Sequence, residues 1–126
     1  MIVGNVNRNY EIVVPYSIQD AAGTWHMMEA ILDTGFTGSL TLPSPVIAQL
    51  GLPWHSRGKA ILADGQLQEF AIHEASIIWC DEPRRILVQA IDFVPLLGVR
   101  LLMNHRLKVT FQVGGTVRID AIPLVQ

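Results

Sequence analysis

Asp33 is the residue whose setting in the sequence is best suited to chemistry. It ends an apolar run at Ile31 and Leu32 and is followed by Thr34 and Gly35, where the glycine allows a sharp backbone turn. A carboxylate at the end of a buried strand is costly unless its surroundings use it, for example in proton transfer. The alternative is a structural turn in which the carboxylate accepts backbone N–H groups. Residues 33–35 alone are compatible with both interpretations.

Strand-like segments surround this aspartate and predict how it is positioned. Residues 25–32 (WHMMEAIL) run directly into Asp33, and residues 10–16 (YEIVVPY) are rich in β-branched and aromatic side chains. A turn is predicted between them at residues 20–23. Residues 39–42 predict a short strand just after the Asp33 turn.

Two short helices are predicted. The first follows residues 39–42, with Ser44 at the N-cap, Pro45 at the first helical position and Gly51 as the stop. The second is a helix-compatible segment at residues 99–104.

Three further pairs of strand-like segments are each joined by a turn sequence, which predicts three hairpins. The pairs are residues 59–62 with 66–72, residues 75–80 with 85–91, and residues 107–113 with 116–122. About eight strands and two short helices in one chain predict a mainly β fold, closed or sandwiched.

Four motifs, in this order along the chain, resemble the retropepsin-like aspartic proteases, and most closely the small bacterial members of that group. They are residues 33–38 (DTGFTG), 40–43 (LTLP), 63–65 (ADG) and 95–98 (PLLG). The resemblance covers nearly the whole chain. It implies a single retropepsin-like aspartic protease domain over residues 1–126, a small closed β-barrel of the acid protease type that works as a homodimer.

The resemblance also implies an activity, that of an aspartic endopeptidase. Such enzymes hydrolyse peptide bonds with two neighbouring carboxylates, one ionised to take a proton from water and one protonated to polarise the scissile carbonyl. This chain has one Asp-Thr-Gly sequence; its other aspartates are Asp20, Asp64, Asp81, Asp92 and Asp120, and none precedes Thr-Gly. The second catalytic carboxylate is therefore expected from Asp33 of a second copy across a two-fold axis.

Roles for the neighbours of Asp33 follow from the same resemblance. Thr34 would join a hydrogen-bond network across the axis, and Gly35 would keep the backbone close to the substrate. The alternative for Thr34 is a solvated turn hydroxyl. Phe36 departs from the retroviral pattern, in which this residue is usually small. Its ring would either fill a substrate pocket or turn into the core.

The hairpin at residues 59–72 would be the flap that closes over a bound peptide, with Ala63, Asp64 and Gly65 near its tip and in contact with substrate. The alternatives are a plain surface hairpin and, for Asp64, a turn-forming role. Residues 96–98 would form an apolar loop packed behind the Asp33 turn.

The composition excludes several other classes of function. Nine basic and eleven acidic residues give a net charge of −2, so there is no basic field to attract nucleic acid. The chain has no apolar run of the roughly 20 residues that would span a membrane. The mean hydropathy of +0.35 indicates apolar surface that a second copy would cover. Cys80, the one cysteine, and the absence of a signal-peptide pattern lead us to expect a cytoplasmic protein.

No cofactor and no metal are expected, because the four histidines (His26, His55, His73 and His105) are far apart in the sequence. Two alternatives to a protease remain. One is a peptide-binding or assembly module on the same fold with little or no turnover, which peptide binding without cleavage at any pH would favour. The other is an unrelated β-barrel interaction domain in which residues 33–35 form a coincidental turn.

Overall fold

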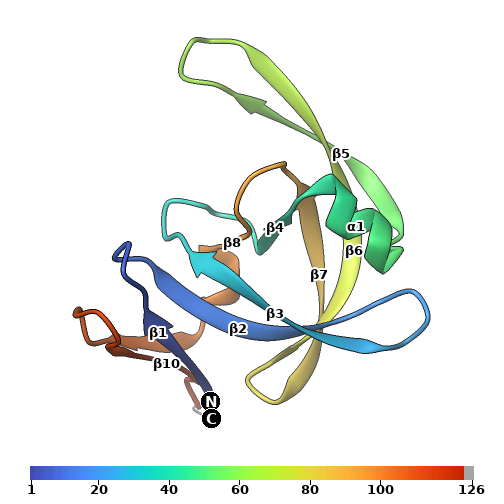
Figure 1. Cartoon of the computed structure of the whole chain (residues 1–126). Coiled ribbons are helices and arrows are strands. Elements are labelled where there is room, and N and C mark those ends of the chain that lie inside the picture. Colours follow the sequence, from blue (N-terminus) through green and yellow to red (C-terminus); the bar gives the residue numbers. More distant parts are fainter. Residues whose placement is uncertain (124–126) are drawn as a thin grey trace.

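The computed structural model describes residues 1–123, and these residues are mainly β (Figure 1). Its strands are β1 (Ile2–Val6), β2 (Ile12–Gln19), β3 (Trp25–Leu32), β4 (Leu40–Leu42), β5 (Trp54–Ile61), β6 (Leu67–Trp79), β7 (Glu82–Ala90), β8 (Leu96–Leu97), β9 (His105–Val109) and β10 (Thr116–Ala121). One α-helix, α1 (Ser44–Leu50), and one 3₁₀ helix, η1 (Val99–Leu101), accompany them. No helix in the described part of the chain is long and apolar enough to cross a membrane.

The strands form a single mixed sheet in the order β5-β6-β7-β4-β8-β3-β2-β1-β10-β9. An additional antiparallel pairing joins β6 to β2, where Ile77 lies opposite Ile18 and Ile78 lies opposite Ser17. The sheet therefore curves far enough to bring two strands that are distant in the order into contact. Strands β3, β8 and β4 lie next to one another at the centre of the sheet. The segment that follows β3, which begins at Asp33, is therefore held at both ends by central strands.

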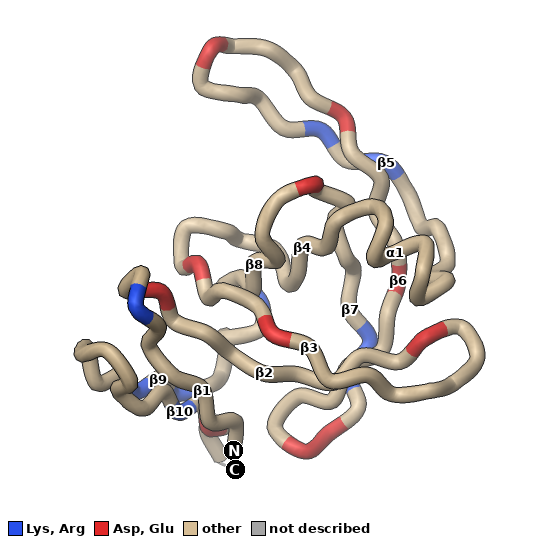
Figure 2. The backbone as a smooth tube through the Cα atoms, viewed as in Figure 1, with Lys and Arg blue, Asp and Glu red and all other residues tan. Residues whose placement is uncertain are grey.

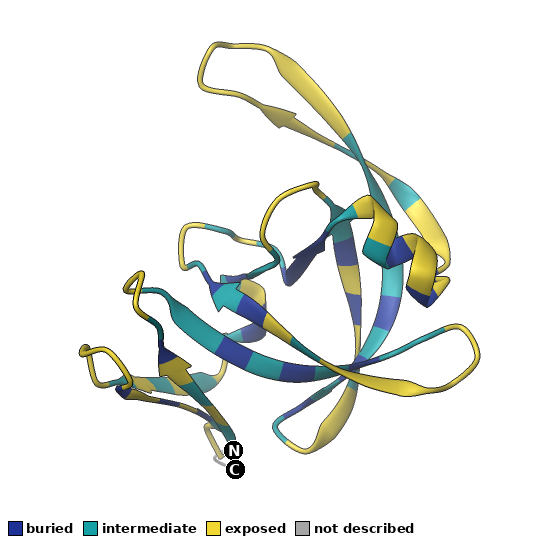
Figure 3. Ribbon diagram, in the orientation of Figure 1, coloured by how far each residue is buried: buried dark blue, intermediate teal, exposed yellow. Residues whose placement is uncertain are grey.

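The core lies on the inner face of this curved sheet. Buried and more exposed residues alternate along β2 and along much of β6 and β7, the period expected of strands with one covered face (Figure 3). In β2 the buried residues are Val14, Tyr16 and Ile18. Burial raises the pKa of the Tyr16 phenol.

Strand β6 corrects the sequence prediction of separate strands at residues 66–72 and 75–80. It is one strand of 13 residues, whose first half pairs with β5 and whose second half pairs with β2. His73 and Glu74 interrupt the apolar pattern, yet both stay in the ladder, opposite Val88 and Leu87 of β7. His73 and Glu74 are therefore half-buried residues within one continuous strand, and they do not separate two strands.

The helices also differ in detail from the sequence prediction. The N-cap of α1 is Pro43 and not Ser44; the Ser44 backbone N–H donates to Asp92 Oδ1 at 2.8 Å. The predicted stop is confirmed, since Gly51 has the left-handed backbone (φ 65°) typical of a C-cap. The predicted helix at residues 99–104 shortens to the three residues of η1, and Asn104 has a positive φ of 65° that ends the segment.

The sequence prediction of about eight strands missed β1 and β8. Strand β1 contains Gly4, where an added Cβ would lie 2.1 Å from the Val13 carbonyl oxygen, so this glycine permits close approach to β2. Strand β8 has only two residues. Neither segment has a pattern long enough to be recognised from sequence alone.

Candidate active site

Asp33 is the first residue after β3, and backbone hydrogen bonds fix its position. Its N–H donates to the Leu97 carbonyl at 2.9 Å, and its own carbonyl accepts the Phe36 N–H at 3.1 Å. Its Oδ1 accepts the Gly35 N–H at 2.9 Å. Within residues 1–123 no hydrogen bond reaches Oδ2, and the residue is only half-buried. The carboxylate therefore forms the turn with one oxygen and leaves the other without a hydrogen bond within residues 1–123.

Strand β8 lies directly behind this turn, as expected for residues 96–98. It pairs in parallel with β3, with Leu97 opposite Leu32, and antiparallel with β4, with Leu97 opposite Leu40. All three of these leucines are buried. The strands entering and leaving the Asp33 turn are thus held by the same two-residue strand, which limits how far the carboxylate can move.

Close packing between glycines and Phe36 supports the turn from the other side. An added Cβ on Gly98 would lie 2.1 Å from the Gly38 carbonyl oxygen and 2.6 Å from Phe36 Cδ2. A Cβ on Gly38 would lie 2.6 Å from Phe36 Cζ. The half-buried Phe36 ring therefore packs against the backbone of its own turn at Gly38 and Gly98.

A buried threonine that the sequence analysis did not single out completes the support. Thr41 is 1% exposed, and its hydroxyl accepts the Leu96 N–H at 2.9 Å. A strand of two residues has few backbone partners, so this side chain satisfies one of its donors. The signal in the sequence is a hydroxyl between two leucines in a short apolar strand.

The remaining predicted residues of the turn are exposed. Thr34 lies on the surface of this single chain. Gly35 is exposed as well, and a Cβ there would meet only Asp33 Oδ1, at 3.2 Å. Asp33, Thr34 and Gly35 thus form one surface turn, with Phe36 as its inner anchor.

The hairpin of β5 and β6 stands away from the rest of the protein (Figure 1). At its tip the Leu62 N–H donates to the Gln66 carbonyl at 2.8 Å, and Gly65 has a left-handed backbone with φ 83°. Asp64 Oδ1 accepts the Gln66 N–H at 2.9 Å, which is the turn-forming role considered for it. Ala63, Asp64 and Gly65 are all exposed, and no hydrogen bond joins them to residues 33–35 in the described structure.

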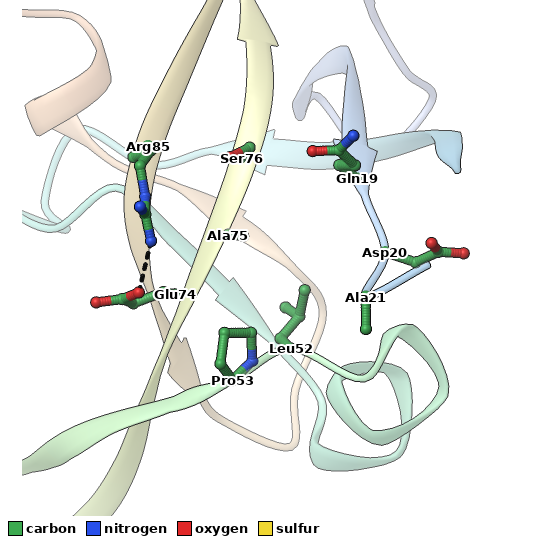
Figure 4. Close-up of a pocket in the computed structure, with 9 residues that line it drawn as sticks. All are labelled: Gln19, Asp20, Ala21, Leu52, Pro53, Glu74, Ala75, Ser76 and Arg85. Atoms are coloured by element: carbon green, nitrogen blue, oxygen red, sulfur yellow. Dashed lines mark hydrogen bonds and ion pairs between the residues drawn. The ribbon is translucent and has the colours of Figure 1, made fainter. Parts of the chain in front are cut away.

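Two cavities differ in how close they lie to the Asp33 turn. A groove of about 520 Å³ begins at Thr37, Gly38 and Ser39, immediately beyond the Asp33 turn. A smaller pocket of about 120 Å³ includes Gln19 and is bordered by an ion pair (Figure 4). Its residue Gln19 pairs with Trp25, at the opposite end of β3 from Asp33, and the eight residues between Trp25 and Asp33 span roughly 26 Å of extended strand. The groove is therefore the cavity adjacent to the candidate site.

The titratable groups outside the turn are dispersed. No group of three or more His, Cys, Asp and Glu side chains that could hold a metal ion occurs within residues 1–123. His26 lies 2.8 Å from Asp20, and this hydrogen bond, together with the Thr24 N–H, lowers the pKa of the Asp20 carboxyl. Burial raises the pKa of the Cys80 thiol, which makes it a poor nucleophile.

Comparison with known proteins shows a likeness to a solved structure. No protein-family model matches the sequence, and no curated protein matches it. Among solved structures, the chain is similar to a retropepsin-like aspartic protease from Rickettsia conorii, with a TM-score of 0.60 and 16% sequence identity. The similarity covers 94% of this chain and 90% of that one. The chain therefore has the fold of the retropepsin-like aspartic proteases.

Proposed function

We propose that this protein is an aspartic endopeptidase, with one catalytic domain over residues 1–126 that acts as a homodimer on peptide or protein substrates. The observation that carries the proposal is the state of the Asp33 carboxylate. One oxygen is held by the Gly35 N–H, the backbone is held by Leu97, and within residues 1–123 the other oxygen has no hydrogen bond. Pairing of β8 with β3 and the hydrogen bond between Thr41 and Leu96 hold the strands on both sides of this turn in place.

In the proposed reaction two Asp33 carboxyl groups, one from each subunit, share a single proton and bind a water between them. The ionised carboxylate takes a proton from the water, and the resulting oxygen attacks the scissile carbonyl carbon. The protonated carboxyl donates its proton toward the carbonyl oxygen, so the tetrahedral intermediate is neutralised. The carboxyl that took the proton from water then donates it to the amide nitrogen, and the C–N bond breaks. The other carboxylate takes a proton from one hydroxyl of the intermediate, which becomes the product carboxylic acid, so the pair again holds a single shared proton.

The two-fold dimer follows from the count of carboxylates, because one chain supplies one Asp-Thr-Gly turn. The exposed Thr34 hydroxyl is available for a hydrogen bond to the partner turn. The resemblance to the retropepsins also implies that the chain ends, Met1 to Gly4 and Pro123 to Gln126, interleave at the interface. Strand β1 pairs with β10 of its own chain, and residues 124–126 lie outside the described structure. An interface built on β1 would thus compete with pairing inside the chain.

Substrate would lie between the Asp33 turns and the hairpin of β5 and β6. In this proposal Gly35 and the hairpin tip at residues 63–65 contact the peptide backbone. Phe36 borders the cleft with the edge of a ring that is packed on Gly38 and Gly98. The isolated Cys80 fits a reducing compartment, so we propose a cytoplasmic enzyme.

The test is cleavage of a diverse peptide library, read by mass spectrometry across acidic and neutral pH, with and without a pepstatin-type inhibitor. Wild-type activity should follow a bell against pH with its optimum below neutrality, because the reaction needs one ionised and one protonated carboxyl. Asp33→Asn should remain folded and lose cleavage. The matched control is Asp81→Asn, which changes an exposed aspartate with a positive φ of 68° in the β6–β7 turn and should retain cleavage. Full cleavage by Asp33→Asn would overturn the proposal.

A further inference from the structure

The groove beside the Asp33 turn has a distinct composition. It lies over β7, between the loop after the Asp33 turn and the outer side of β6. Its lining residues are Thr37, Gly38, Ser39, Ile72, Arg84, Arg85, Ile86, Leu87, Gln89 and Arg100. Three of these are arginines and none is acidic, although the chain as a whole carries more acidic than basic residues. The groove is thus a local basic site on an acidic protein.

Two of the three guanidinium groups lack an acidic partner. Arg85 forms an ion pair with Glu74 at 2.7 Å, and its charge is thereby compensated. Within residues 1–123 no carboxylate lies within 4.0 Å of Arg84 or Arg100. The Arg84 guanidinium makes one long contact, 3.5 Å, to the Arg100 carbonyl oxygen. Two positive charges therefore face the groove without internal neutralisation; Figure 2 shows the basic positions along β7.

The other lining residues add apolar and hydrogen-bonding surface, which a peptide side chain can use and a small inorganic ion cannot. Leu87 is 43% exposed and Ile72 is half-buried, so the groove has apolar surface for the stem of a side chain. Gln89 and Thr37 supply hydrogen-bonding groups at its edge. A volume of about 520 Å³ is large enough for several atoms beyond a single carboxylate.

The groove lies within reach of a substrate held at Asp33. Thr37 is four residues after Asp33, and four residues of fully extended chain span at most about 14 Å. The actual distance is shorter, because the Phe36 N–H donates to the Asp33 carbonyl and closes a turn. An extended peptide advances about 3.3 Å per residue, so a side chain within about four residues of the scissile bond can reach this loop. Arg100 lies beside the same loop, since its N–H donates to the Gly38 carbonyl at 3.2 Å. A symmetric dimer would present the groove once at each end of the cleft.

We propose that this groove binds an acidic side chain of the substrate, within about four residues of the scissile bond, through Arg84 and Arg100; this assignment rests on the proposed endopeptidase function. The carboxylate would accept charge-assisted hydrogen bonds from the two guanidinium groups. The partner is therefore a peptide with acidic residues flanking an apolar centre.

The experiment measures binding separately from cleavage. Two fluorescein-labelled peptide libraries of about ten residues are prepared, identical except that the outer positions are Glu in one and Gln in the other. Binding is measured with the Asp33→Asn protein, which cannot turn them over, and with Arg100→Gln and Arg84→Gln/Arg100→Gln added to it. The matched control is Arg106→Gln, which removes the same charge from the exposed face of β9. Cleavage of both libraries by the wild-type protein is measured in parallel.

The Glu library should bind about five- to tenfold more tightly than the Gln library, as expected for two exposed charge pairs. Arg100→Gln should reduce this ratio to about threefold, the double variant should abolish it, and Arg106→Gln should leave it unchanged. High salt should weaken only the Glu library. Equal binding of the two libraries, or a ratio that survives in the folded double variant, would overturn the assignment. If the protein cleaves both libraries without preferring Glu, the assignment of the groove is wrong and the proposed endopeptidase activity stands. If the Glu library binds more tightly in an arginine-dependent way but neither library is cleaved, the proposed endopeptidase activity is wrong.

Discussion

Gly98→Ala is the substitution whose cost the structure defines most directly. The new Cβ would lie 2.1 Å from the Gly38 carbonyl oxygen and 2.8 Å from the Phe36 carbonyl oxygen. Neither oxygen is free to move, because Gly38 O accepts the Arg100 N–H at 3.2 Å and Phe36 O accepts the Val99 N–H at 2.8 Å. Relief of the clash requires η1 to separate from the loop that follows the Asp33 turn.

The magnitude follows from two contributions. Overpacking in a closely packed region costs about 1–3 kcal/mol. Each backbone hydrogen bond broken to relieve it costs about 1 kcal/mol more. We therefore expect Gly98→Ala to lower the free energy of unfolding by roughly 3–5 kcal/mol. For a chain of this length, this corresponds to a fall in Tm of roughly 12 °C or more.

The assay is thermal and urea unfolding of the variant beside Gly65→Ala. At Gly65 an added Cβ meets nothing within 4 Å, and the cost is limited to the left-handed backbone with φ 83°. That cost is about 1–2 kcal/mol. If Gly98→Ala unfolds within 1 kcal/mol of the wild type, or no earlier than Gly65→Ala, the close packing that we assign to this turn is wrong.

Three other predictions concern separate parts of the chain. Thr41→Val leaves the part-buried Leu96 N–H unpaired and should cost about 1–3 kcal/mol in unfolding free energy, whereas Thr41→Ser should keep most of the stability; equal stability of the two variants would contradict the role of the hydroxyl. The hydrogen bond from His26 lowers the pKa of the Asp20 carboxyl from its ordinary value of 3.8. The ionised Asp20 carboxylate therefore stabilises the folded state above that pH, and this stabilisation is lost as the pH falls through the lowered pKa. Asp20→Asn should therefore melt below the wild type at pH 7, with a difference that shrinks toward pH 2.5; a difference independent of pH would refute this. Amide hydrogens in residues 59–72 should exchange faster than those of the core and slow when a pepstatin-type inhibitor binds; equal exchange with inhibitor bound would mean that this hairpin is not a lid.

The sequence predicts the part of the site that local patterns determine. Residues 25–32 coincide with β3, and Asp33 lies at its end, because an apolar strand followed by Thr-Gly is a local signal. The Asp64 turn and the Gly51 stop are likewise determined by neighbouring residues. The turn interpretation and the chemical interpretation of Asp33 are both compatible with the structure, since one carboxylate oxygen accepts the Gly35 N–H and the other has no hydrogen bond within residues 1–123.

Non-local partners account for what the sequence did not predict. Strand β8 has two residues and exists because β3 and β4 pair with it from both sides. The donor that Ser44 presents at the start of α1 is satisfied by Asp92, 48 residues away. The arginines of the groove come from β7 and η1, which the sequence alone does not bring together. Such features depend on the closure of the whole sheet.

Subunit mixing tests the central claim, that one site is formed by Asp33 of two chains. Wild-type protein at a fixed concentration is exchanged with increasing amounts of Asp33→Asn, well above the concentration needed for dimerisation, and peptide cleavage is measured. Since mixed dimers would lack one carboxylate, an equal amount of Asp33→Asn should reduce cleavage to about half, and a large excess should abolish it. Exchange with Asp81→Asn should cause no loss. Cleavage that stays constant under excess Asp33→Asn would show that each chain acts alone and would contradict the account.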